Sequence, residues 1–131
     1  MARTPDALGE RASHFLSERH LGTLATLRKD GTPHLVVVGF TWDPHARLVR
    51  VITNAGSQKA LNADRGGYAA VSQVDGGRWL TLEGSVRVRD DAGAVAAGVA
   101  RYTRRYRPPR ENPTRVVVEI AVERVMGSVL D

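Results

Sequence analysis

The chain has 131 residues, 42% of them hydrophobic, which is the size and apolar content of a single domain with a full core. Nineteen lysine and arginine residues against fourteen acidic ones give a formal net charge of +5, which suits an acidic ligand or a polyanion without choosing between them. The absence of cysteine excludes disulfide scaffolds, thiolate metal sites and thiol nucleophiles, and indicates a cytoplasmic protein.

The first predicted elements are a helix and a β-hairpin. The Thr4-Pro5 pair is a helix start, and the apolar residues after it recur at helical spacing as far as about Arg19. Two β-prone runs, 21–27 and 34–42, are separated by Asp30-Gly31, a strong hairpin signal. We expect these two runs to pair, and a run over 48–53 to follow them as a third antiparallel strand.

The segment after this third strand predicts an anion site. Ser57 opens a short helix, and the start of a helix leaves several backbone N–H groups unpaired and positive. Lys59 and Asn62 fall on one face of that helix, beside these groups. We interpret the segment as a corner that holds a phosphate. The alternative stays open that Ser57 is only a helix cap and Lys59 a solvated charge.

The second half of the chain predicts another hairpin, a helix and a last strand. Runs 68–74 and 78–88 flank an Asp-Gly-Gly turn, and the second run alternates apolar and polar residues. Apolar residues from Val95 to Tyr106 recur at helical spacing, and a proline-rich crossing then leads to a strand over 115–125. Six short strands and about three helices favour a mainly β (α+β) fold, a closed or half-closed antiparallel barrel, in one domain over residues 1–131.

The chemical motifs are notable for what is missing. The four histidines, His14, His20, His34 and His45, lack metal-ligand spacing, so no metal site is expected. No G-x-S-x-G, P-loop or G-x-G-x-x-G pattern occurs, which leaves serine hydrolysis, P-loop hydrolysis and Rossmann binding without support. No apolar run reaches the roughly 20 residues that cross a membrane. If the protein is an enzyme, its chemistry is expected to belong to a bound cofactor.

Three blocks of the sequence resemble the split β-barrel flavin and deazaflavin family. They are L-G-T-L-A-T-L-R-K-D-G-T-P-H-L-V-V-V, V-I-T-N-A-G-S-Q-K-A-L-N and V-S-Q-V-D-G-G-R-W-L-T-L-E-G. Within it the chain is most similar to the pyridoxine-oxidase-like enzymes that use coenzyme F-420, an 8-hydroxy-5-deazaflavin, and particularly to their biliverdin reductase branch. The resemblance implies a six-stranded split β-barrel, a homodimer, and hydride transfer from reduced coenzyme to an unsaturated acceptor, foremost biliverdin.

The resemblance also implies three groups of cofactor-binding residues, while it names no catalytic side chain. The first group runs beside the deazaflavin ring, the second binds the ribityl phosphate region, and the third closes the pocket. The groups are His34, Leu35, Val36 and Val37; Thr53, Ser57, Lys59 and Asn62; and Gln73, Arg78 and Trp79. From the residues alone, His34 and the valines can equally be core strand residues, and Trp79 can be a core filler.

Several alternatives remain open at this level. An FMN-binding relative would use the same phosphate corner, and a non-catalytic carrier would bind the coenzyme without turnover. Nucleic-acid binding is disfavoured, because Tyr102 and Tyr106 have core spacing rather than that of an exposed stacking face. A basic cluster can contact a polyglutamate tail or the propionates of biliverdin, or can be a solvated helix face. Its members are Arg101, Arg104, Arg105, Arg107 and Arg110.

Overall fold

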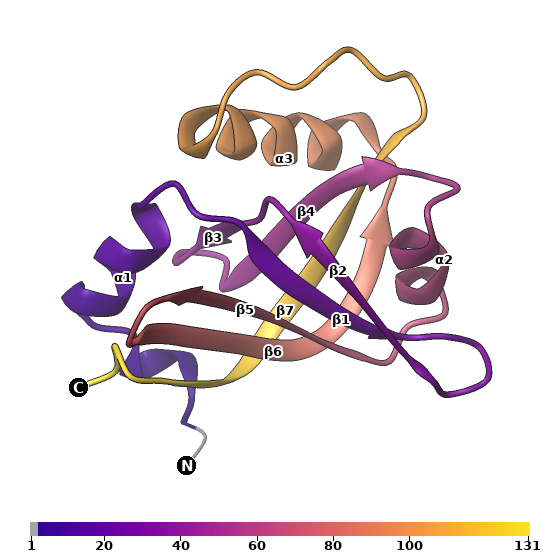
Figure 1. Ribbon diagram of the computed structural model, residues 1–131. Helices are drawn as coiled ribbons and strands as arrows, with labels where there is room; N and C mark the ends of the chain where they lie inside the picture. Colours follow the sequence, from indigo (N-terminus) through magenta and orange to yellow (C-terminus); the bar gives the residue numbers. More distant parts are fainter. Residues whose placement is uncertain (1–2) are drawn as a thin grey trace.

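The computed structural model describes residues 3–131, which form a single seven-stranded antiparallel sheet with three α-helices around it (Figure 1). This confirms the predicted mainly β, barrel-like class. The strands are β1 (Gly22–Leu27), β2 (Pro33–Val38), β3 (Thr41–Asp43), β4 (Leu48–Asn54), β5 (Tyr68–Asp75), β6 (Arg78–Arg89) and β7 (Arg115–Gly127). The helices are a 3-10 turn η1 (Pro5–Ala7), α1 (Glu10–Ser17), α2 (Gln58–Asp64) and α3 (Ala92–Arg105).

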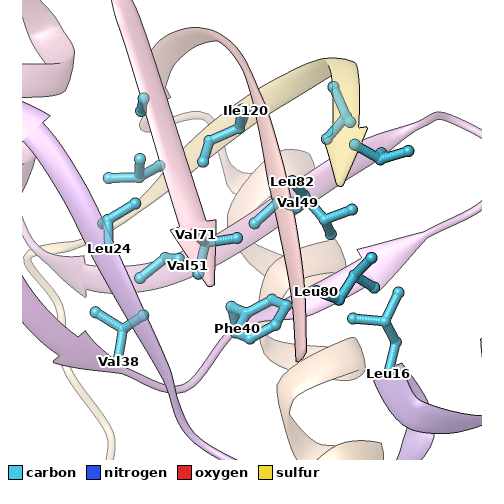
Figure 2. Packing of buried hydrophobic residues seen from close by; sticks show 14 of the residues in the cluster. Leu16, Leu24, Val38, Phe40, Val49, Val51, Val71, Leu80, Leu82 and Ile120 are labelled. Carbon is cyan, nitrogen blue, oxygen red and sulfur yellow. The ribbon is translucent and has the colours of Figure 1, made fainter. Parts of the chain in front are cut away.

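The sheet curls around one apolar core. Its strand order is β2-β1-β5-β6-β7-β4-β3, so the two edge strands, β2 and β3, are neighbours in the sequence. Side chains from opposite strands meet inside the curl, among them Leu24, Val71 and Ile120, which are at most 1% exposed (Figure 2). The register between β6 and β7 shifts at Gly84, where a Cβ atom would lie 1.8 Å from the Ala121 carbonyl oxygen. Only glycine fits this bulge.

The prediction of six strands is wrong by one, because the run 34–42 divides into β2 and β3. The division falls at Gly39 and Phe40. A Cβ atom on Gly39 would lie 2.9 Å from the Tyr102 ring, so the chain passes directly under α3 at this point. Phe40 turns its ring into the core, where it is 1% exposed. Tertiary packing against α3 therefore interrupts a segment whose composition is uniformly β-prone.

The prediction of three successive antiparallel strands is confirmed, with the second run divided between two partners. The first two runs pair as expected, with Thr26 opposite His34. The third run, β4, pairs with β3, the end of the second run, and its other neighbour is β7, with Val49 opposite Ile120. Its apolar residues are buried there between two neighbours, which a local hairpin signal does not reveal.

The helical segments agree with their predicted apolar faces better than with their predicted bounds. The expected helix from Thr4 to Arg19 is broken into η1 and α1 at Leu8 and Gly9, because Gly9 takes the N-cap position of α1 in an extended conformation. The core-facing side of α1 carries Ala12, Phe15 and Leu16, all buried. Among residues 3–131, no helix combines the length and the apolar character needed to cross a membrane.

Candidate functional site

A pocket of about 320 Å³ lies where the end of β2 faces β4 beneath α3. Its wall on the β2 side is apolar, formed by Val37, Val38 and Gly39, and Tyr102 of α3 covers it. The opposite end is polar and basic. That end carries Thr53, Asn54, Lys59, Asn112 and Arg115.

The predicted start of a short helix at Ser57 is confirmed. The Ser57 hydroxyl accepts a hydrogen bond from the Ala60 amide at 3.3 Å and one from the Thr53 hydroxyl at 3.0 Å. Ser57 is thus the N-cap of α2 and joins that helix to the end of β4. Because α2 has only seven residues, the positive charge of this corner comes chiefly from side chains.

Lys59 is the predicted residue that most clearly points to an anion. Its side chain lines the polar end of the pocket, and burial lowers the pKa of its ammonium group. Arg115 lies at the same end. Among the ion pairs formed by residues 3–131, none includes Lys59 or Arg115. Two cations without carboxylate partners, beside an apolar wall, suit a ligand with an anionic group at one end.

Asn62 lies away from the pocket lining. It is 3% exposed, and its amide nitrogen donates to the Thr26 hydroxyl of β1 at 3.0 Å. Its amide oxygen accepts from Gln58 at 2.7 Å and from Arg65 at 3.1 Å. The structure therefore separates Asn62 from Lys59 and uses it to fasten α2 to the sheet.

The four predicted residues of β2 alternate between the two faces of the strand. Leu35 and Val37 are exposed by 69% and 63%, and Val37 also lines the pocket. Val36 packs against the core, and His34 is half-buried. Within residues 3–131, the His34 Nδ1 atom is buried without a hydrogen-bond partner. Of these four residues, Val37 is the one that the structure places in the pocket wall.

The predicted hairpin residues do not line this pocket within one chain. Gln73 is fully buried, donates to the Phe15 carbonyl at 2.8 Å and accepts from Arg105 at 2.5 Å. Arg78 donates to both carboxylate oxygens of Glu18, at 2.8 and 2.9 Å. Trp79 is 38% exposed and lies beside a different hollow, near the end of β7.

The surroundings of Arg78 form an ionic network rather than an open binding site. Glu18, His20 and Asp75 bring possible metal-ligand atoms within 4.8 Å of one another, but Arg78 donates to both carboxylates. Hydrogen bonds from Arg78, and next from His20, lower the pKa of Glu18 to about 2. Arg78 also lies over the Phe15 ring, 4.7 Å from its centroid. The cluster therefore joins α1 to the β5–β6 hairpin.

The arginines of the basic cluster in and after α3 fall into two groups, those that bond to the barrel and those that are exposed. Arg101 pairs with Asp43 at 3.2 Å, and Arg105 donates only to groups of the protein. Arg104, Arg107 and Arg110 are exposed. The run of arginines is therefore partly a solvated face and partly an attachment of α3 to the barrel.

Three of the pocket residues, Val37, Thr53 and Lys59, were predicted from the sequence. The others were missed, namely Val38, Gly39, Val51, Ile52, Asn54, Tyr102, Pro109, Asn112 and Arg115. Arg115 reaches the site because it stands opposite Asn54 in the β4–β7 pairing. Asn112 donates from its side chain to the Asn54 side chain, and the Ala55 amide donates to the Thr114 carbonyl at 3.0 Å. The prolines between α3 and β7 indicate a loop in the sequence, but they do not show that this loop contacts the end of β4.

The chain is similar in sequence and in structure to several known proteins. The chain is 57% identical over 128 residues to the F420H(2)-dependent biliverdin reductase of Mycobacterium tuberculosis (strain CDC 1551 / Oshkosh), which covers 98% of this chain and 93% of that protein. A conserved hypothetical protein of Mycobacterium tuberculosis has a similar crystal structure, with a TM-score of 0.75 and 26% identity over 88% of this chain and 80% of its own.

A solved structure described as an F420 reductase is also similar, with a TM-score of 0.66 and 26% identity over 89% of this chain and 95% of its own. The family model described as pyridoxamine 5'-phosphate oxidase matches residues 8–128. This match includes every strand of the sheet and all the residues of the pocket. The chain therefore belongs to the pyridoxamine 5'-phosphate oxidase family.

Proposed function

We propose that this protein is a coenzyme F-420-dependent oxidoreductase that reduces an unsaturated acceptor of the biliverdin type. The observation that carries the proposal is the 57% identity to an F420H(2)-dependent biliverdin reductase over nearly the full length of both chains. The pocket supports it independently, because it pairs an apolar wall with a cationic end. That arrangement matches a flat ring system that carries a phosphate-bearing side chain.

In this proposal Lys59 and Arg115 bind the phosphate region of the coenzyme. Thr53 and Asn112 line the same end, where their side chains bond to Ser57 and Asn54 and hold the corner in place. The lowered pKa of Lys59 reflects the cost of its burial, which a bound anion would offset. Ser57 does not bind the phosphate in this proposal but holds the start of α2, and with it Lys59, in place. Val37 and Tyr102 lie along the apolar wall and are the candidates for contact with the ring.

The reduced deazaflavin supplies the hydride when it is bound, so the chain itself needs no nucleophile or metal. The contribution of the protein is to orient the ring, to exclude water from the apolar wall and to neutralise the phosphate. This division of roles agrees with the pocket, whose charged side chains are the two cations at its phosphate end.

We further propose that the protein works as a homodimer in the cytoplasm. Edge strand β2 presents Leu35 and Val37 to the outside. Leu21, immediately before β1, and Val74 on β5 are exposed nearby, by 58% and 65%. Exposed apolar residues on a sheet edge are typical of an interface. Because Val37 belongs both to this face and to the pocket, a second copy would cover the pocket entrance. The cysteine-free sequence agrees with a reducing compartment.

The test is a pair of titrations followed by an activity assay. We expect the purified protein to bind F-420 more tightly than FMN, and to oxidise reduced F-420 when biliverdin is added, as followed by the coenzyme absorbance. Tighter binding of FMN than of F-420 would show that FMN, and not F-420, is the cofactor. Tight binding of F-420 without turnover of biliverdin, quinones or nitro compounds would instead indicate a coenzyme carrier.

A further inference from the structure

We propose that Arg105 is a positioning residue for the coenzyme pocket, which it acts on through the backbone of Gly39 and Phe40. The inference rests on the proposed function, since it concerns the same pocket. It assigns to Arg105, and to its partners Gln73 and Tyr106, a role in shaping the pocket wall rather than in contacting the ligand.

The Arg105 side chain joins three segments that are far apart in the sequence. Its Nε atom donates to the Glu18 carbonyl at 2.9 Å, and its two terminal nitrogens donate to the Phe40 carbonyl at 2.7 Å and to the Gln73 side-chain oxygen at 2.5 Å. The guanidinium also lies over the Phe40 ring, 4.7 Å from its centroid. One planar group thus connects α3 with the end of α1, with β5 and with the turn after β2.

Tyr106 completes the attachment from the end of α3. Its hydroxyl donates to the His20 carbonyl at 2.6 Å and accepts from the Phe40 amide at 3.2 Å. Burial raises the pKa of Tyr106, so the hydroxyl stays protonated and remains a donor. The Tyr106 ring would lie 3.3 Å from a Cβ atom on Gly39.

The Phe40 backbone therefore depends on side chains of α3. Residues 39 and 40 lie between β2 and β3, outside the named strands. The N–H and C=O groups of Phe40 are bonded by Tyr106 and Arg105, where a strand would use its neighbour. Gly39, immediately before it, lines the pocket. The position of the pocket wall at Gly39 therefore depends on α3, which is more than 50 residues away in the sequence.

A correctly placed wall matters because binding to a preformed surface avoids the cost of ordering it. Gln73 extends the same support, since it accepts from Arg105 and donates to the Phe15 carbonyl. Removal of the guanidinium would leave the Phe40 and Gln73 oxygens without this donor. The turn would then be free to move, and coenzyme affinity would fall although no ligand contact is lost.

The test compares Arg105→Met with Arg124→Met. Methionine keeps the apolar stem and removes the donors. Arg124 is a suitable control because it too lies over an aromatic ring, that of Tyr68, and does not line the pocket. We expect Arg105→Met to raise the F-420 dissociation constant about 10-fold or more. Amide hydrogen exchange over residues 36–42 should also accelerate. Arg124→Met should change neither quantity more than 2-fold.

A folded Arg105→Met protein with either wild-type affinity or wild-type exchange over 36–42 would overturn the inference. If Arg105→Met does not fold, Tyr106→Phe removes only the hydroxyl, and the same two measurements decide. The exchange measurement needs no ligand. Failure of the wild-type protein to bind F-420 would therefore refute the proposed function, while unchanged exchange in the variants would refute the positioning role.

Discussion

The corner between β4 and α2 and the junction between α1 and the β5–β6 hairpin carry similar residues but use them differently. The corner holds Lys59 in a pocket, outside the ion pairs of the described residues. The junction holds Arg78 between the carboxylates of Glu18 and Asp75. Both regions were predicted to contact the coenzyme. The difference teaches that the residue type identifies a possible ligand-binding cation, whereas the partners decide whether it is available.

The two arrangements also differ in what they do for stability. A half-buried ammonium without a partner is destabilising until an anion binds. A guanidinium that is bonded to carboxylates and stacked on a ring holds segments together and has little left to offer a ligand. Substitutions at the junction should therefore change folding first, and substitutions at the corner should change binding first.

The largest effect is expected for Gln73→Leu. Leucine removes both polar ends of a fully buried side chain and leaves the Phe15 carbonyl and the Arg105 guanidinium short of a partner. We expect a loss of about 2–4 kcal/mol in the free energy of unfolding, measured by urea denaturation. Lys29, exposed in the turn between β1 and β2 and changed to alanine, is the control and should cost about 0.5 kcal/mol or less. Equal stability of Gln73→Leu and wild type would contradict this account of the junction.

Lys59→Ala should mainly change binding. Loss of one charge-assisted contact is worth about 1.5–3 kcal/mol, so the dissociation constant for F-420 should rise about 10-fold or more. Lys29, the other lysine of the sequence, lies exposed in the β1–β2 turn and serves as the control. Titration of both variants with the coenzyme checks this. If Lys29→Ala and Lys59→Ala weaken binding equally, the corner is not the anion site.

The Glu18 network predicts a dependence of stability on acid. Because hydrogen bonds from Arg78 and His20 lower the pKa of Glu18 to about 2, folding favours its ionised form. The resulting stabilisation is present above the ordinary glutamate pKa and is lost as the pH falls from about 4.5 towards 2. We expect the melting temperature of wild type to fall more steeply over this range than that of Glu18→Gln. Parallel curves for the two proteins would show that Glu18 is not held ionised by folding.

The smallest effect is expected for Lys59→Met without ligand. Methionine keeps most of the side-chain volume and removes the charge that burial disfavours. The melting temperature should rise slightly, by an amount equivalent to about 1 kcal/mol or less, while F-420 affinity falls as in Lys59→Ala. A drop in stability would mean that the ammonium group has a structural partner, and that the contrast between the two regions is weaker than we infer.

The sequence alone determined the local features of this protein. Asp30-Gly31 predicted the β1–β2 hairpin, Ser57 predicted the cap of α2, and the alternation along β6 predicted a strand with one buried face. These features follow from residues close together in the chain, because turn conformation, capping and periodicity are local properties. The family resemblance extended them to the fold class and to the coenzyme that we propose.

Only the tertiary structure decided which residues share a site. Asn54 meets Arg115 through a pairing of β4 with β7, and Gly39 is shaped by residues of α3. Asn62 and Gln73 bond to the protein itself, which their sequence motifs do not show. The physical reason is that long-range pairing and side-chain satisfaction depend on the whole packed core, whereas a motif specifies only spacing along one segment.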